Sequence, residues 1–466
     1  MAGYRIRDGI LIFLLAAVLA VLPVPLAGAV ADAYTAQHVT LTWTDKASVT
    51  QTITWKTESS WPVGKIMYAE KADSNVFAAK ATVVTATSRP LPADGSGLVV
   101  HVAALTGLKP DTTYMYLLGD GDSWSRPYWF TTAPANTAAF RFLVFGDSQS
   151  DRYESWGRLV RQAYQANPQA AFLTVVGDLV DVGADYGQWR EWFDAAEAVI
   201  SNVTVMPLTG NHETYTPVLG ERTMPVLFTA QFKLPANGPD GLQGLVYSFD
   251  YGDAHFVILD SQEREEARFI PDMLARQQAW LDADLAATAK RWKIVLLHKT
   301  PYPVKSGRSN ESVKAAFVPL FDKHRVDVVI SGHDHVYART YPLTGDKITA
   351  GGTIYVTAGR SGAKAYQYVT PNELHEFFHN PFEEPNYLVV EVGQDKLSVK
   401  TVSQSGQQID SWQRMKERTQ GKSPHEAYYR ASFGDSQINR LPDFFRPTVL
   451  QAVWHKDRFI TAKANY

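Results

Sequence analysis

The stretch RFLVFGDSQ, residues 141–149, is a run of apolar residues that ends at Gly146 and Asp147. A short apolar run closed by a glycine is typical of a buried β-strand. A segment with helical spacing, Ser155 to Ala166, follows it. Together they predict the first strand and helix of a domain in which strands and helices alternate.

The same order repeats along residues 138–410. Predicted strands are 141–145, 172–176, 203–208, 255–260, 293–298, 326–331 and 353–358, and predicted helices are 155–166, 189–200, 271–289 and 313–323. This alternation predicts an α/β domain whose functional side chains gather at the carboxyl ends of the strands.

A different pattern precedes this domain, in residues 34–135. Runs such as HVTLTW, TQTITW and TYMYLL alternate apolar and polar residues and are separated by turn residues, which predicts an all-β sandwich. The stretch from Leu105 to Leu118 resembles the tyrosine corner of a fibronectin type III domain, with Tyr114 as the corner residue.

Both ends of the chain lie outside these two domains. Residues 1–31 combine Arg5 and Arg7, an apolar stretch and small residues at A-x-A spacing, which predicts a secretory signal peptide. An uncleaved membrane anchor is the alternative. We expect the working part to be secreted or otherwise outside the cytoplasm, with no stable membrane insertion after cleavage.

Residues 411–466 form a tail, rich in aromatic residues and arginine, whose role the sequence does not indicate. It contains FGDSQINR, residues 433–440, which nearly repeats FGDSQSDR at 145–152. No strand-like run precedes this second copy, so we interpret Asp435 as a turn residue.

Composition narrows the chemistry. Lysine and arginine total 45 against 48 acidic residues, without the basic stripe that binding a nucleic acid would need. The chain has no cysteine, so any metal site must use nitrogen and oxygen ligands.

Five predicted strands end in polar residues of the types that bind metal ions. These residues are Asp147 and Gln149, Asp178 and Asp181, Asn211 and His212, His298, and His333 and His335. Their number fits two divalent cations, which need a shared carboxylate to offset their repulsion. Asp178 is the candidate for this bridge.

The series GD, GDLVD, GNHE, LLH and GHDH resembles the calcineurin-like metallophosphoesterase superfamily, and with the β-sandwich in front the chain resembles its purple acid phosphatase branch. The resemblance implies a two-sheet α/β sandwich with a dinuclear metal site that hydrolyses phosphoesters through a metal-activated water. It implies a first metal on Asp147, Asp178 and His335, a second on Asp178, Asn211, His298 and His333, and phosphate contact or leaving-group protonation by His212.

Two positions depart from the family pattern. Purple acid phosphatases have an iron-binding tyrosine where this chain has Asp181, and most other members have a histidine where it has Gln149. The remaining ligand of the first metal is therefore Gln149, Asp181 or water. We expect two divalent ions, Mn, Zn, Fe or Mg, and a colourless protein.

Other polar residues near these motifs have less certain roles. Glu213 and Asp334 are candidates to orient the ligand imidazoles, or else exposed turn carboxylates. Lys305 and Arg308 can bind phosphate, or are solvated loop cations.

Three alternatives to a phosphomonoesterase remain. A phosphodiesterase would use the same fold, and an exported binding protein would have lost activity. The third is a zinc peptidase, because HEFFH at 375–379 matches the H-E-x-x-H pattern, although the helix available for it is short. We interpret the segment instead as a loop that packs beside the site through Phe377, Phe378 and Phe382. A small phosphoester is the expected substrate, and its identity is open.

Overall fold

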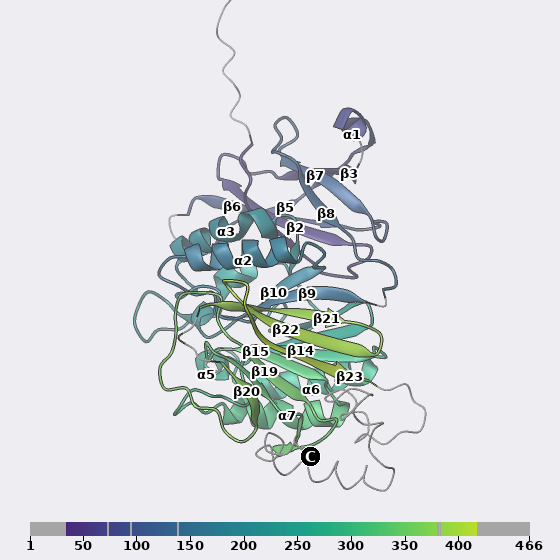
Figure 1. Cartoon of the computed structure of the whole chain (residues 1–466). Coiled ribbons are helices and arrows are strands. Elements are labelled where there is room, and N and C mark those ends of the chain that lie inside the picture. The colour runs from purple at the N-terminus through teal and green to yellow at the C-terminus, as the bar shows by residue number, and fades with distance from the viewer. Residues whose placement is uncertain are drawn as a thin grey trace, which may run out of the picture. The chain divides into compact units, whose positions relative to one another are not determined.

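The structure is a computed structural model that describes residues 34–71, 74–93, 96–137, 139–379, 382 and 384–416 (Figure 1). The expected signal peptide, Asp435 and most of the tail lie outside the described residues. Within the described ranges, no helix combines the length and apolar character needed to span a bilayer.

The N-terminal region is a sandwich of two four-stranded sheets, as the alternating pattern predicts. One sheet has the order β1 (Gln37–Thr42), β2 (Gln51–Glu58), β6 (Leu98–Leu105), β5 (Thr87–Pro90), and the other β4 (Thr82–Thr85), β3 (Lys65–Glu70), β7 (Thr113–Gly119), β8 (Tyr128–Thr131), with helix α1 (Ser74–Lys80) after β3. The Tyr114 hydroxyl accepts a hydrogen bond from Lys109 N at 2.9 Å, the contact expected of a tyrosine corner.

Two further sheets form the α/β domain. The six-stranded sheet has the order β11 (Thr204–Val205), β10 (Phe172–Val175), β9 (Phe140–Phe145), β21 (Asn386–Val392), β22 (Lys396–Ser403), β23 (Gln408–Met415). The seven-stranded sheet has the order β12 (Tyr247–Tyr251), β13 (Ala254–Leu259), β14 (Trp292–Lys299), β15 (Val328–Gly332), β19 (Ile354–Ala358), β16 (Tyr337–Thr340), β20 (His375–Phe378). Strands β9 and β10 are parallel, as are β13, β14, β15 and β19.

The two sheets pack face to face through aromatic side chains. Phe142 of β9 stacks on Phe172 of β10, with ring centroids 4.9 Å apart, and meets Phe256 of β13 edge-on at 5.2 Å. Helices lie on the outer sides, with α2 and α3 on one side and α6 and α7 on the other (Figure 1). Their bounds are α2 (Glu154–Ala166), α3 (Tyr186–Ile200), α6 (Met273–Ala287) and α7 (Glu311–His324).

Shorter elements complete the domain. They are η1 (His212–Thr214), α4 (Val226–Gln231), α5 (Glu263–Glu266), β17 (Leu343–Thr344) and β18 (Lys347–Ile348). Strand β23 crosses the expected domain boundary at residue 410 and reaches Met415.

The sandwich has a hydrophobic core of its own, and some of its residues, Trp43 among them, join the core of the α/β domain. Trp43, directly after β1, meets Phe172 edge-on at 5.5 Å, and the Tyr116 hydroxyl donates to Ser201 O at 2.7 Å. The sandwich therefore supports the α/β domain by packing.

The loop predicted around residues 375–379 is wrong, and so is the short helix that the peptidase alternative needs. His375–Phe378 form strand β20, which pairs antiparallel with β16. The strand lets Phe377 pack beside Tyr337, with centroids 5.8 Å apart, while Phe378 packs against Val304 and Val336. Partial burial of two adjacent aromatic side chains on opposite faces favours a strand over a helix here.

Candidate metal centre

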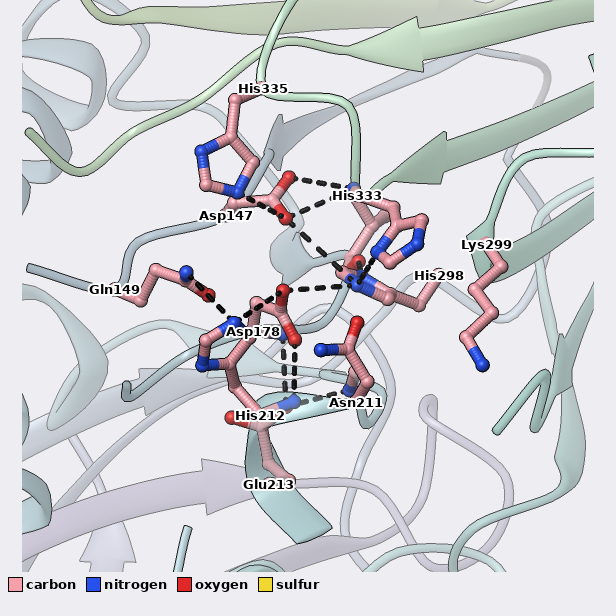
Figure 2. A network of polar contacts seen from close by, with 12 residues as sticks. Asp147, Gln149, Asp178, Asn211, His212, Glu213, His298, Lys299, His333 and His335 are labelled. Atoms are coloured by element: carbon pink, nitrogen blue, oxygen red, sulfur yellow. Dashed lines mark hydrogen bonds and ion pairs between the residues drawn. The ribbon is translucent and has the colours of Figure 1, made fainter. Parts of the chain in front are cut away.

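The predicted site residues converge at the carboxyl ends of β9, β10, β14 and β15 (Figure 2). Asp147 follows β9 and Asp178 follows β10, while His298 lies near the end of β14. His333 and His335 follow β15 in the GHDH motif. Asp147, Asp178, His298 and His335 are each at most 1% exposed, so these polar groups are built into the interior.

Two groups of side chains could each hold a cation. One is Asp147, Asp178 and His335, and the other is Asp178, His298 and His333, with the ligand atoms of each group within 4.8 Å of one another. Asp178 belongs to both groups. Its carboxylate lies between the rings of His212 and His298, facing the space that the other candidates surround (Figure 2).

Two buried atoms at the centre lack a hydrogen-bond partner within the described part of the chain, Asn211 Oδ1 and His335 Nε2. The Asn211 amide nitrogen donates to Tyr215 Oη at 2.8 Å, and His335 Nε2 lies 3.3 Å from Asp147 Oδ1. A buried polar atom without a partner costs about 1–3 kcal/mol. A divalent cation would satisfy both atoms, and carboxylate, imidazole and amide oxygen are donors that such ions accept.

Backbone carbonyls orient the imidazoles. His298 Nδ1 lies 2.8 Å from Val176 O, and His335 Nδ1 lies 2.7 Å from Lys364 O. A carbonyl can only accept, so Nδ1 of each ring carries a proton and Nε2 faces the centre. His333 presents Nδ1, which is 3.1 Å from His298 Nε2.

The carboxylates and imidazoles of the group affect one another's protonation. Burial lowers the pKa of His298, but Asp178 and Asp147 raise it to about 9, so a cation that binds this ring displaces a proton. Burial and the neighbouring His298 lower the pKa of His333 well below its usual range, so this ring is neutral. Burial raises the pKa of Asp178, but the nearby His298 and His212 imidazoles outweigh it and hold that pKa well below its usual range. An ionised carboxylate and a neutral imidazole are the forms that bind metals.

The backbone at the centre is strained, and the glycines of the motifs leave the space it needs. Asp178, His333 and His335 have φ of 52°, 75° and 55°, in the left-handed region. A Cβ at Gly210 would lie 2.1 Å from Asp178 Oδ1, and one at Gly177 would lie 2.4 Å from His298 Nδ1. No larger residue fits at either glycine unless a candidate ligand moves.

The expectation that Glu213 and Asp334 orient imidazoles is wrong. Glu213 is 1% exposed, and its carboxylate accepts hydrogen bonds from the backbone N–H of Asp178, Leu179, Val180 and Gly210. Asp334 accepts from Val304 N at 2.6 Å and from Lys305 N at 3.1 Å. Both carboxylates therefore hold loop backbone in place and do not orient the ligand imidazoles.

Asp181 lies outside both candidate ligand groups. Its Oδ1 is 2.8 Å from Lys364 Nζ and 3.2 Å from His212 Nδ1, and its backbone oxygen is 2.6 Å from the same Nδ1. His212 is thereby held with Nε2 toward the centre, 3.9 Å from Asp178 Oδ2.

Gln149 lies at the centre and is fully buried. In the amide orientation that satisfies its neighbours, its nitrogen donates to Asp178 Oδ2 at 3.0 Å and its oxygen accepts from Lys364 Nζ at 2.9 Å. In the opposite orientation, the amide oxygen faces Asp178. Lys364 thus contacts both Asp181 and Gln149, the two positions that depart from the family pattern. No motif in the sequence indicates that Lys364 belongs to the site.

A cavity of 370 Å³ opens beside the centre. His212, Asn211 and His333 line one side, and the loop from Lys305 to Asn310 lines the other. A small ligand in this cavity would reach the candidate metal ligands.

Family profiles match both halves of the described chain. The profile of calcineurin-like phosphoesterases matches residues 140–337, and that of the purple acid phosphatase N-terminal domain matches residues 36–132. The chain carries both of these domains. The range matched by the phosphoesterase profile contains every candidate metal ligand described above, whereas Lys364 lies beyond it.

Several curated proteins are similar to more than half of the chain. Purple acid phosphatase 13 of Arabidopsis thaliana is 27% identical over 307 residues, which cover 58% of this chain and 55% of that protein. Phosphoenolpyruvate phosphatase of Allium cepa is 26% identical over 352 residues, covering 71% of this chain and 70% of that protein. The chain spans 55% to 65% of the length of several such relatives.

The structure of a purple acid phosphatase from yellow lupin (Lupinus luteus) seeds superposes with a TM-score of 0.68 at 20% identity, covering 82% of this chain and 74% of that one. This likeness confirms the predicted fold class, a two-sheet α/β phosphoesterase domain behind a β-sandwich.

The peptidase alternative loses its structural basis. Glu376, which would be the catalytic base of an H-E-x-x-H site, forms an ion pair with Arg339. His375 Nδ1 lies 2.8 Å from Asn372 Oδ1, and neither candidate ligand group of the described residues includes His375 or His379. The segment is a paired strand, so its two histidines do not share a helix face.

Proposed function

We propose that this chain is a metal-dependent hydrolase of small phosphomonoesters. The observation that carries the proposal is the pair of candidate ligand groups that share the buried Asp178. The phosphoesterase domain match and the relatives named as phosphatases support the same conclusion.

In this proposal Asp147, Asp178 and His335 hold the first cation, and Asp178, Asn211, His298 and His333 hold the second. The chemistry that such cations supply when bound is Lewis-acid activation of water and of the phosphoryl oxygens. The protein provides no covalent nucleophile in this scheme. The geometry is fixed because backbone carbonyls hold His298 and His335, and backbone N–H groups hold the carboxylates of Asp147 and Asp178.

His212 has the position of a proton donor to the leaving group. It lines the cavity, and its Nδ1 is engaged with Asp181, which leaves Nε2 to face the substrate. Hydrolysis breaks the bond between phosphorus and the ester oxygen and forms one between phosphorus and the water oxygen. The departing alkoxide then takes a proton from His212.

We propose Asp181 as the residue that positions His212, because Lys364 and the imidazole occupy its carboxylate. The first cation then completes its coordination with the Gln149 amide oxygen or with water. A neutral ligand at this place suits Mn²⁺, Mg²⁺, Zn²⁺ or Fe²⁺. Asp181 stands where the iron-binding tyrosine would supply the coloured phenolate, so we propose a colourless protein.

We also propose that the protein is exported, on the basis of the charged and apolar pattern of residues 1–31. A fusion of residues 1–40 to a reporter, compared with the same reporter without them, tests this. Release of the reporter only from the fusion supports export, and retention of both contradicts it.

The activity is tested with phosphomonoesters and phosphodiesters assayed with added Mn²⁺, Zn²⁺, Fe²⁺ or Mg²⁺. Asp178→Asn keeps the shape of the shared carboxylate and removes its charge, and Asp272→Asn makes the same change at an exposed position. We expect metal-dependent release of phosphate from monoesters that is abolished in Asp178→Asn and kept in Asp272→Asn. Equal turnover in both variants would refute the assignment.

A further inference from the structure

The cavity beside the metal centre is rich in positive charge. It is lined by Arg264, Lys299, Lys305 and Arg308, with Glu265 as the carboxylate in the same lining. Its 370 Å³ lies at the small end of the range of about 300–1,000 Å³ for small-molecule sites. The cavity therefore suits a compact ligand with negative charge.

Three of these cations already have oxygen partners. Lys299 pairs with Glu265 at 2.6 Å, Arg308 with Asp334 at 2.6 Å, and Arg264 donates to Ser309 O at 2.8 Å. Lys305 differs. Among the described residues, no carboxylate lies within ion-pair distance of its ammonium group, which instead sits 3.4 Å from the centroid of the Tyr366 ring.

The position of Lys305 is fixed relative to the metal centre. Its backbone N–H donates to the buried Asp334 carboxylate, which lies between the two histidines of the GHDH motif. Tyr366, beneath its ammonium group, stacks on the candidate ligand His335 with ring centroids 4.1 Å apart. Lys305 is half-buried, so its charge has lost part of its hydration without gaining a counter-ion.

We infer that the leaving group of the substrate carries a second negative charge, a carboxylate or a phosphate, which binds Lys305. The inference rests on the proposed function, because the scissile phosphate is placed at the metal centre and the leaving group in the cavity. The substrate class is then small phosphorylated hydroxy acids and bisphosphates. A neutral leaving group would leave a partly desolvated ammonium group unpaired.

The test compares two esters that differ only in this charge, the phosphate ester of β-hydroxypropanoate and that of its primary amide. Their leaving alkoxides are alike, so the ratio of kcat/KM reports the second charge. We expect wild-type protein to prefer the acid by about tenfold, the effect of one well-placed charge pair. Lys305→Met should lower this ratio about tenfold, and Lys305→Arg should keep most of it.

Lys400→Met is the matched control, because it removes the same charge from an exposed position on β22. It should leave the acid-to-amide ratio at the wild-type value. The bisphosphate of propanediol, compared with its monophosphate, shows whether a phosphate or a carboxylate is the better second anion. The inference is overturned if wild-type protein does not prefer the acid, or if Lys305→Met and Lys400→Met change the ratio alike.

A binding measurement separates this inference from the proposed function. γ-Phosphonobutanoate and its primary amide cannot be hydrolysed, and calorimetric titration gives their Kd values for the same variants. Acid-selective binding that depends on Lys305, without turnover of either ester, would refute the hydrolase and support the anion site. Turnover of both esters with equal Kd values for the two phosphonates would support the hydrolase and refute the anion site.

Discussion

Replacement of Glu213 by glutamine should destabilise the protein strongly, although the two side chains have nearly the same shape. Glu213 Oε1 accepts hydrogen bonds from Leu179 N at 2.8 Å and Val180 N at 3.2 Å. Oε2 accepts from Asp178 N at 2.9 Å and Gly210 N at 2.6 Å. In Glu213→Gln, one oxygen becomes an NH2 group, so two backbone N–H groups face a donor.

Each buried donor without a partner costs about 1–3 kcal/mol, so the free energy of unfolding should fall by about 2–6 kcal/mol. Burial and Asp178 raise the pKa of Glu213, which favours its neutral form. However, both oxygens face only N–H donors, and a proton on either oxygen would have no acceptor. We therefore assign the ionised carboxylate, which glutamine cannot replace.

Urea unfolding of wild-type protein, Glu213→Gln and Glu373→Gln measures this effect. Glu373 is exposed, so its variant controls for the loss of one carboxylate. Glu213→Gln should also bind less metal, because the four N–H groups hold the turns that carry Asp178 and Asn211. An unfolding free energy within about 0.5 kcal/mol of the Glu373→Gln value would refute the reasoning.

Three further predictions concern pH, proton donation and colour. Burial lowers the pKa of His255, but Asp250 and Asp284, each 2.7 Å from one ring nitrogen, raise it to about 9. Because the pKa is higher in the folded protein, the two ion pairs stabilise the fold by up to about 3 kcal/mol. This stabilisation is complete below pH ~6.5 and is lost as the pH rises through about 9. Urea unfolding across this window should show the loss in wild-type protein and not in His255→Gln, and parallel curves would contradict the assignment. Asp181→Asn and Lys364→Met should each lower kcat about 10- to 100-fold with little change in KM, because His212 loses its orientation. Steady-state kinetics measure this effect, with Lys400→Met as the control. An unchanged kcat would exclude the positioning role of Asp181. Protein loaded with iron should have no purple band in its visible spectrum, because Asp181 replaces the iron-binding tyrosine, and such a band would contradict this expectation.

The strands that carry the site could be predicted because they are buried. RFLVF and KIVLLH are continuous apolar runs, and the polar residues after them stand out against that background. The short strand β20 was mispredicted because four residues carry no periodicity, and its pairing with β16 is set by distant contacts. The two-residue strand β11 likewise lies inside a longer apolar run.

The roles of individual polar residues were harder to predict. Glu213 and Asp334 bind backbone N–H groups, and a sequence does not show where such donors point. Lys364 and Tyr366 reach the site from the loop after β19, far in sequence from the residues they contact. Loop contacts of this kind follow from the assembled fold, and no local motif marks them.

The central claim is that Asp178 is shared by two cations. Crystals of the protein grown with Mn²⁺ and measured for anomalous diffraction test it most directly. We predict two peaks about 3.5–4 Å apart, both within bonding distance of Asp178, with Asn211 Oδ1 at one and His335 Nε2 at the other. A single peak at saturating Mn²⁺, or two peaks that do not share Asp178, would contradict it.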